Sequence, residues 1–275
     1  MKKKKSIFIF MFLWCSSMNV FGQISDKAFF YSATYSSDST DRNNLNTDFM
    51  VLWSGNNYSV FESYYRYQSD SFKTAVSNQS TNPRDLNMSA ILGQMVSMKK
   101  PSFDFIIHKS WKEKEITAYN NLFFDNFEYT QPLKMDGWKI EDQYKEILGY
   151  KCQKASIHYA GRNFIAWYTE EIPLSDGPYV FNGLPGLILQ LEDVQNYYRF
   201  ELVGIRNTSI EMGERVLSKT ISLPKEQFFL TKKSMYKDVR KALLGKPSSV
   251  SDEAIRDVQV RYDKKNNPLE LVVGK

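Results

Sequence analysis

Cysteine and histidine are scarce in this chain of 275 residues, which has two of each. Cys15 lies in an N-terminal segment that looks removable, so Cys152 would stand alone and no disulfide could form within the remaining chain. We interpret Cys152 as a buried apolar thiol, with a reactive or intermolecular thiol as the alternative. No Cys-x-x-Cys pair and no His-Glu-x-x-His motif occurs, which excludes the sites that those motifs build.

A long apolar run near the N-terminus is also missing. Four lysines at positions 2–5 precede a short apolar run, residues 7–14, and a membrane helix needs roughly 20 apolar residues. We expect residues 1–22 to be a signal peptide that is removed before Gln23. Residues 23–275 would then form a single domain without a transmembrane segment, in the periplasm or outside the cell. A lipoprotein acylated at Cys15 is the alternative, although the preceding Trp14 is bulky for such a site.

An excess of one charge is absent once the signal is removed. The whole chain has 36 basic and 31 acidic residues, for a net charge of +5. Residues 1–22 contain four lysines and no acid, so 32 basic and 31 acidic residues remain. No basic field is left that would favour nucleic acid or anionic lipid as a partner.

Known catalytic motifs are missing too. The chain has no G-x-S-x-G elbow and no phosphate-binding P-loop. A hydrolase could use two of its carboxylates, but spacing along the chain does not show that any two converge. The candidates are Glu170, Glu171, Asp176 and Asp193.

Other polar residues offer no stronger site. His108 and His158 could share a metal only if their strands were neighbours, and we interpret both as ordinary surface or hydrogen-bonded residues. Arg162 follows Gly161 and is interpreted as a residue at a hairpin tip. We therefore assign no catalytic, cofactor-binding or metal-binding residue and expect no cofactor.

Short segments rich in aromatic and β-branched residues recur along the chain. Alternation and turn residues predict strands at 28–35, 49–53, 58–63, 103–107, 113–119, 122–129, 150–159, 163–169, 187–193 and 197–205. The clearest hairpin turns are Ser54–Asn57 and Ala160–Arg162. Strands this short, without intervening helices, indicate an antiparallel meander.

Helical spacing appears in three places. Met88, Ile91, Leu92, Met95 and Met98 predict a helix that packs on the sheet, with Asp85 as its N-cap and Pro101 after its end. An adaptable apolar lid and a copper site of thioethers are the alternatives. The polar stretch 68–85 before it is expected to be an exposed connection.

The last third of the chain is expected to hold the C-terminal helices. A helix opens near Pro224, and a stripe of Met235, Val239, Ala242 and Leu243 ends at Gly245 and Pro247. One further short helix follows Ser251. The lysines between these apolar positions are interpreted as a solvated face.

The most distinctive stretch is Gly183-Leu184-Pro185-Gly186-Leu187-Ile188. We expect Gly183 and Gly186 to adopt positive φ, with Pro185 fixing the chain between them in a loop that passes close to other backbone. Alternation from Leu187 to Asp193 predicts a strand with one buried face. A nest of glycine amides that binds an anion is the alternative.

On these residues the chain resembles the GLPGLI proteins, secreted proteins of Bacteroidetes-type bacteria with no assigned activity. The resemblance extends to the segments 149–152, 160–162, 166–168, 177–179 and 267–271. It implies a family and a compartment but no reaction.

Together these patterns predict a mainly β (α+β) fold, a curved antiparallel sheet or half-barrel with a few helices packed on it. Aromatic residues make up 15% of the chain. Some of them are expected to build the core, and the rest could line a concave apolar surface. The function expected is that of an exported, non-enzymatic binding module for an apolar ligand or an envelope partner. The alternative is a secreted hydrolase with converging carboxylates. The sequence does not identify the ligand, the partner or the oligomeric state.

Overall fold

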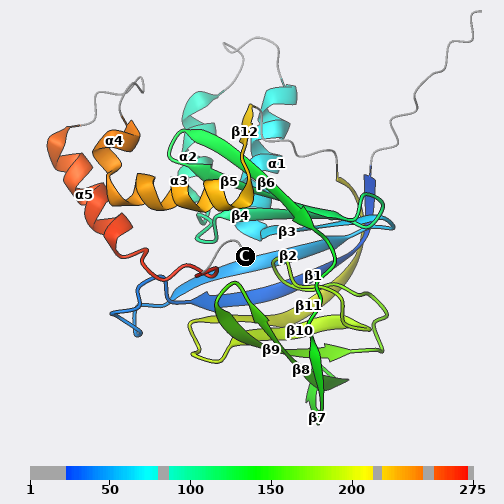
Figure 1. Cartoon of the computed structure of the whole chain (residues 1–275). Coiled ribbons are helices and arrows are strands. Elements are labelled where there is room, and N and C mark those ends of the chain that lie inside the picture. Colours follow the sequence, from blue (N-terminus) through cyan, green and yellow to red (C-terminus); the bar gives the residue numbers. More distant parts are fainter. Residues whose placement is uncertain (1–22, 80–86, 213–218, 244–250, 272–275) are drawn as a thin grey trace, which may run out of the picture.

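The computed structural model describes residues 23–79, 87–212, 219–243 and 251–271 (Figure 1). Within these ranges twelve strands form one open sheet in the order β12-β6-β5-β4-β3-β2-β1-β11-β10-β9-β8-β7. Neighbouring strands are antiparallel except β12, which pairs with β6 in parallel. The strands are β1 (Gln23–Tyr35), β2 (Asn46–Ser54), β3 (Tyr58–Ser63), β4 (Phe105–Ser110), β5 (Glu115–Leu122), β6 (Asp125–Pro132), β7 (Lys139–Ile147), β8 (Tyr150–Tyr159), β9 (Arg162–Thr169), β10 (Leu187–Asp193), β11 (Tyr198–Met212) and β12 (Thr220–Ser222).

The predicted fold class, a mainly β protein with helices packed on a curved antiparallel sheet, is confirmed. The helices are α1 (Tyr64–Gln79), α2 (Met88–Ser97), α3 (Lys225–Lys237), α4 (Val239–Leu243) and α5 (Asp252–Asp263). Figure 1 shows the helices around the β4–β6 end of the sheet, while β7 lies at the opposite end. None of the described helices is long and apolar enough to cross a membrane.

Alternation along the central strands gives the sheet two apolar faces. The inner face carries the larger buried cluster, which includes Phe29, Tyr31 and Phe61. The outer face carries a smaller cluster that includes Phe30 and Trp53. Helix α3 covers part of the inner face and α1 part of the outer face, because Phe228 belongs to the first cluster while Tyr64 and Tyr67 pack against the second.

The predicted hairpins are present at both turns. Strands β2 and β3 pair around residues 55–57, and β8 pairs with β9 around Ala160 and Gly161. Both residues of the second turn have positive φ, +46° and +84°, as a two-residue hairpin of the mirror-image type requires.

The prediction of an exposed connection at 68–85 is wrong for most of that stretch, since α1 runs from Tyr64 to Gln79. Tertiary contacts explain this helix better than its polar composition does. Tyr64 meets the ring of Phe30 at 5.4 Å, and Tyr67, one turn later, meets Trp53 at 4.7 Å. Two aromatic anchors spaced by three residues hold the segment on the outer face.

The helix predicted at Met88 is present as α2, but its predicted packing on the sheet is wrong, because none of its residues is buried. Its N-cap is Asn87, whose Oδ1 accepts from the amide of Ala90 at 3.1 Å. The expected cap, Asp85, lies outside the described residues.

The single stripe predicted from Met235 to Leu243 is divided between α3 and α4, which are separated at Asp238. The expected stops, Gly245 and Pro247, lie outside the described residues. The short helix expected after Ser251 is confirmed as α5, with Ser251 Oγ accepting from the amide of Ala254.

Candidate functional site

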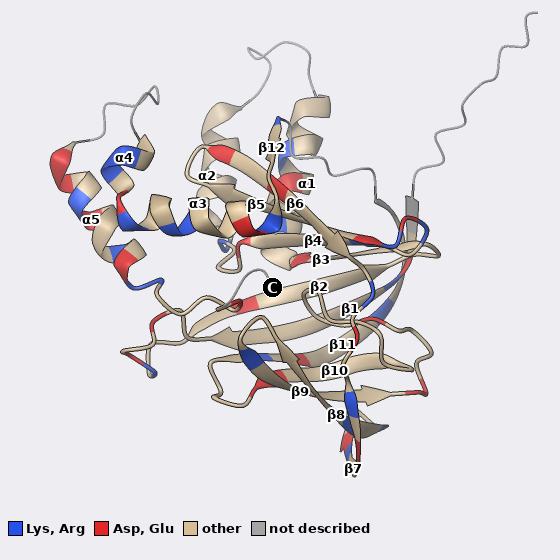
Figure 2. Ribbon diagram, in the orientation of Figure 1, with Lys and Arg blue, Asp and Glu red and all other residues tan. Residues whose placement is uncertain are grey.

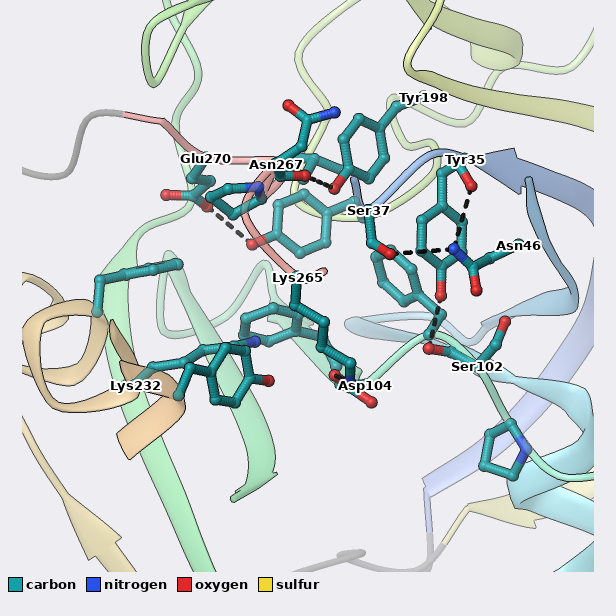
Figure 3. Close-up of a pocket in the computed structure, with 18 of the residues that line it drawn as sticks. Tyr35, Ser37, Asn46, Ser102, Asp104, Tyr198, Lys232, Lys265, Asn267 and Glu270 are labelled. Carbon is teal, nitrogen blue, oxygen red and sulfur yellow. Dashed lines mark hydrogen bonds and ion pairs between the residues drawn. The ribbon is translucent and has the colours of Figure 1, made fainter. Parts of the chain in front are cut away.

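A cavity of about 560 Å³ lies on the inner face, between the sheet, α3 and the C-terminal segment 264–271 (Figure 3). Seven aromatic rings line it, together with polar and charged side chains. The rings come from β1, from β4 and the residues before it, from the segment before β10, from β11 and from α3. They belong to Tyr35, Phe103, Phe105, Tyr179, Tyr198, Phe229 and Tyr236.

Strand pairing positions the first part of this wall. Tyr35 ends β1 opposite Tyr198 of β11, and their rings stack 5.6 Å apart at an angle of 5°. Phe103 meets the ring of Tyr35 edge-on at 5.9 Å. These edge and stacked contacts fix the rings against one another.

The hydroxyls of the two tyrosines are already used inside the protein. Tyr35 donates to the carbonyl of Ser102, and Tyr198 donates to the carbonyl of Asn267, each at 2.6 Å. Burial raises the pKa of both hydroxyls, so they stay neutral. The wall therefore offers ring surface to a ligand without a free polar group from these two residues.

Helix α3 contributes the opposite wall. Phe229, Lys232 and Tyr236 line the cavity and are spaced by three and four residues, which places them on one side of the helix. The ammonium of Lys232 lies 4.5 Å from the ring centre of Phe105 and 5.5 Å from that of Tyr236. It makes no hydrogen bond or ion pair within 4 Å to any residue in the described part of the chain.

Burial lowers the pKa of Lys232 to about 8, and the positive charge of Lys265 adds to this effect. The carboxylates of Asp104 and Glu270 oppose it. A lysine with such a pKa changes its charge close to neutral pH.

The other charged groups of the cavity are better partnered. Lys265 lies 3.5 Å from Asp104 Oδ2 and 4.9 Å from the ring centre of Tyr262. Arg261 is exposed at the edge, where its Nε donates to the carbonyl of its own helix at Asp257.

Glu270 is held on the far side by a buried network. Its Oε2 lies 2.7 Å from the ammonium of Lys225, and its Oε1 accepts from Tyr179 at 2.8 Å and Tyr159 at 3.1 Å. Both carboxylates that line the cavity therefore already have a lysine partner.

The Gly183–Ile188 motif does not line this cavity. Gly183 has the predicted positive φ, +92°, and its amide donates to Ser175 Oγ at 3.2 Å. The prediction of positive φ at Gly186 is wrong. Gly186 is required for another reason, because a Cβ there would lie 2.0 Å from the carbonyl oxygen of Thr169. The close passage over backbone that the motif predicts is confirmed.

The strand after the motif is present, but the prediction of one buried face is wrong. Leu187 to Leu191 are all buried in β10, including Ile188 and Gln190 of the face expected to be open. The segment before the strand covers Ile188, since a Cβ added at Gly177 would lie 2.7 Å from its side chain.

Two of the four candidate carboxylates are structural. Asp176 is fully buried against Lys109, with 2.5 Å between Oδ1 and Nζ, and Ser59 donates to its other oxygen. Asp193 is fully buried against Arg162. Glu170 and Glu171 are exposed, so the four do not form a site.

Arg162 is not the hairpin-tip residue that we expected. It is 2% exposed and donates to Asp193 and to the carbonyls of Pro268 and Leu269. The sequence did indicate that Arg162 could be buried. Alternate residues of a strand share one face, and Arg162 shares the face of the apolar residues Phe164 and Ala166.

The histidines are not brought together. His108 lies in β4 and His158 in β8, and six strands of the sheet order lie between them within the described structure. No group of three His, Cys, Asp or Glu residues in the described ranges could hold a metal ion. Cys152 is a free, fully buried thiol, as predicted.

Comparison with protein families gives one match. A family model described as "Protein of unknown function (Porph_ging)" matches residues 158–190. This segment runs from the end of β8 through Arg162, Asp176 and the Gly183–Ile188 motif into β10. No curated protein matches the chain.

Solved structures that match the chain include two crystal forms of PNGF-II. The form in space group P21 superposes with a TM-score of 0.50 at 13% identity and covers 77% of this chain. The form in C2 gives 0.49, also at 13% identity and 77% coverage. This chain spans only 33% and 32% of those two chains, and the low identity shows a likeness of fold alone. Residues 158–190 are thus similar to a family of unknown function, and the chain shares a fold with part of PNGF-II.

Proposed function

We propose that this protein is a non-enzymatic binding module that holds a small ligand with an apolar or aromatic body in the inner-face cavity. The observation that supports this most is the cavity itself, of about 560 Å³ and lined by seven aromatic rings beside a few polar and charged groups. Pockets for small ligands have volumes of roughly 300–1,000 Å³ and mostly apolar walls with a few polar groups. The rings of Tyr35, Phe103 and Tyr198 already contact one another, and such packing reduces the entropy that a ligand must remove on binding.

The arrangement of the carboxylates disfavours the hydrolase alternative. A glycosidase needs one carboxylic acid and one carboxylate free to act on either side of a bond. Asp104 and Glu270 line the cavity, but Lys265 and Lys225 hold them as partners. No other Asp or Glu lines it in the described structure.

Fluorescence of N-phenyl-1-naphthylamine, an uncharged aromatic probe, tests the proposal. We expect saturable binding of one probe per chain. Phe229→Ala removes a wall of the cavity and should weaken binding about tenfold, the effect of losing one buried aromatic contact.

Leu230→Ala is the matched control, because Leu230 is the next residue of α3, is exposed and does not line the cavity. Equal loss in both variants, or no binding to the wild type, would contradict the proposal. A probe bound on the exposed apolar side of α2 would respond to neither substitution, and this result too would contradict the proposal.

We also propose that the protein is exported to the periplasm or the cell exterior as a single domain beginning at Gln23. The lysines and apolar run of residues 1–22 support this proposal. The intact mass of the exported protein tests it. A mass that includes residue 1, or an acyl group at Cys15, would contradict it.

We further propose that the chain is one of the GLPGLI proteins. Contacts between the segments that carry the resemblance support this: Arg162 of segment 160–162 donates to segment 267–271, and Tyr179 donates to Glu270. Related chains with the same central string should therefore keep these partners together. Chains that vary Arg162 independently of Asn267 would count against the proposal.

A further inference from the structure

Lys232 is a half-buried cation with no carboxylate within 4 Å in the described structure, and it faces a cavity large enough for a small molecule. The rings of Phe105 and Tyr236 stabilise its charge in part. They do not accept its N–H groups as an oxygen would. A ligand oxygen in the cavity would supply such an acceptor next to the half-buried ammonium and would therefore be stabilising.

We propose that the ligand is a small organic anion with a single acid group, which pairs with Lys232 while its apolar or aromatic body lies against Tyr35, Phe103 and Phe105. This inference rests on the proposed binding function and names the chemical class of the ligand.

The charges around the cavity support a monoanion. From the segment before β4 comes Asp104, and from the C-terminal segment come Lys265 and Glu270. Asp104 is compensated by Lys265, and Glu270 by Lys225 from outside the cavity wall. Arg261 of α5 is exposed at the edge. Of the cations around the cavity that are not exposed, Lys232 is thus the one without a carboxylate within 4 Å in the described structure, and its charge matches one negative charge on the ligand.

The charges around the cavity are of both signs. Helix α5 carries Asp257 and Asp263 beside Arg256 and Arg261, whereas α3 carries four lysines and one acid, Glu226 (Figure 2). A polyanion such as nucleic acid requires a continuous basic surface. A small acid that enters the cavity needs only the one ammonium.

The pH dependence of anion binding follows from the charge of Lys232. Its pKa is lowered to about 8, so the ammonium form dominates below that pH and the neutral amine above it. Anion affinity should therefore be highest near pH 6.5 and should fall as the pH rises through 8. A bound anion would favour the charged form and raise this pKa.

Two probes with nearly the same rings separate the acid group from the apolar body. 8-Anilinonaphthalene-1-sulfonate carries a sulfonate that stays ionised throughout this pH range, and N-phenyl-1-naphthylamine does not. At pH 6.5 and constant ionic strength we expect Lys232→Met to weaken the sulfonate probe about tenfold or more, the effect of losing a hydrogen bond to a charged group. The variant should still bind the uncharged probe, with a far smaller change in affinity than for the sulfonate probe, because methionine keeps an apolar side chain in the wall. This binding also shows that the variant is folded.

Lys233→Met is the matched control, because Lys233 is the next residue of α3, is exposed and does not line the cavity. It removes the same net charge and should leave both affinities unchanged. For the wild type, raising the pH from 6.5 to 9.5 should weaken the sulfonate probe and not the uncharged one.

The outcomes distinguish this inference from the function on which it rests. If neither probe binds the wild type, the binding function itself fails. If both probes bind with the same affinity, independently of pH and of Lys232, the function stands and the anion inference is overturned. Equal loss of the sulfonate probe in Lys232→Met and Lys233→Met would also overturn it, since net charge would then be the cause.

Discussion

Arg162 Nη1 lies 3.1 Å from Asp193 Oδ2, and the two side chains are 2% and 0% exposed. The remaining donors of Arg162 reach the C-terminal segment, at the carbonyls of Pro268 and Leu269 and at Asn267 Oδ1. Asp193 Oδ1 accepts from the amide of Tyr198. One ion pair thus joins β9, β10 and β11 to the segment that forms one wall of the cavity.

Arg162→Met should lower the free energy of unfolding by about 3–5 kcal/mol, because it leaves the carboxylate of Asp193 buried without a counter-charge. Urea unfolding measures this directly. The control is Arg199→Met, whose arginine is 50% exposed and pairs with Glu201 at 3.0 Å. Exposed pairs contribute about 0–1 kcal/mol, so the control should remain close to the wild type. Equal losses in the two variants would show that the Arg162 pair has no special structural role.

The buried pair of Lys109 and Asp176 should show strong coupling. Lys109 Nζ also donates to the carbonyls of Gly177 and Phe181, so the pair fixes the chain before the central motif onto β4. Lys109→Met alone should cost about 3–5 kcal/mol, because it leaves a buried carboxylate without its partner.

The double variant Lys109→Met with Asp176→Leu removes both charges and should recover part of that loss. Urea unfolding of the two single variants and the double variant gives the coupling free energy. If the two single losses add in the double variant, the side chains act independently and the predicted coupling is wrong.

Most of the strands could be predicted because each carries its own signal, but β7 and β12 were not predicted. Alternation along 150–159 and 163–169, with Ala160 and Gly161 between them, specified a hairpin from local residues alone. Helix α1 could not be found in this way. It is polar along most of its length and depends on Tyr64 and Tyr67 meeting rings of β1 and β2, which are distant in sequence.

The cavity could not be predicted from the sequence for a related reason. Its walls come from Tyr35, Phe103, Tyr198, Phe229 and Leu269, five parts of the chain that only the sheet order brings together. Alternation shows which residues are buried, but not where the packing between them leaves a space. Lys232 resembles the exposed lysines around it in sequence, and only the position of α3 over Phe105 separates it from them.

Cys152 should react slowly with thiol reagents in the folded protein. Burial raises the pKa of its thiol to about 11, against the opposing charge of Lys145, so little thiolate is present at pH 8. The rate of reaction with 5,5′-dithiobis(2-nitrobenzoate) should rise strongly in urea. The unfolded thiol ionises near pH 9 and the folded one near 11, so this group's contribution to stability is complete below pH 9 and is lost as the pH rises to 11.

Cys152→Ser is the corresponding stability test. We expect a loss of about 1 kcal/mol, an ordinary value for a single substitution. Rapid labelling of the folded protein, or a covalent dimer that the substitution abolishes, would show that the thiol is reactive.

Gly186→Ala should destabilise the protein although φ at this position is not positive. The added Cβ would lie 2.0 Å from the carbonyl oxygen and 2.6 Å from the carbonyl carbon of Thr169, and backbone cannot move aside as a flexible side chain can. Inserting atoms into such a packed place costs about 1–3 kcal/mol, and Gly186→Val should cost at least as much. Thermal or urea unfolding measures both losses.

Gly204→Ala is the matched control, since Gly204 lies in β11 and a Cβ there meets nothing within 4 Å. It should be neutral or slightly stabilising, by up to about 1 kcal/mol.

Pro185→Ala, at an exposed position, should cost about 0.4–1 kcal/mol, because alanine gives the unfolded chain more conformational freedom than proline does. If Gly186→Val unfolded like the wild type and instead lost a partner in pull-downs from envelope extracts, the motif would be a recognition loop. A loss of stability with the cavity probes still bound would instead show that Gly186 serves the approach of β10 to β9, because Leu187 pairs with Thr169 directly after it.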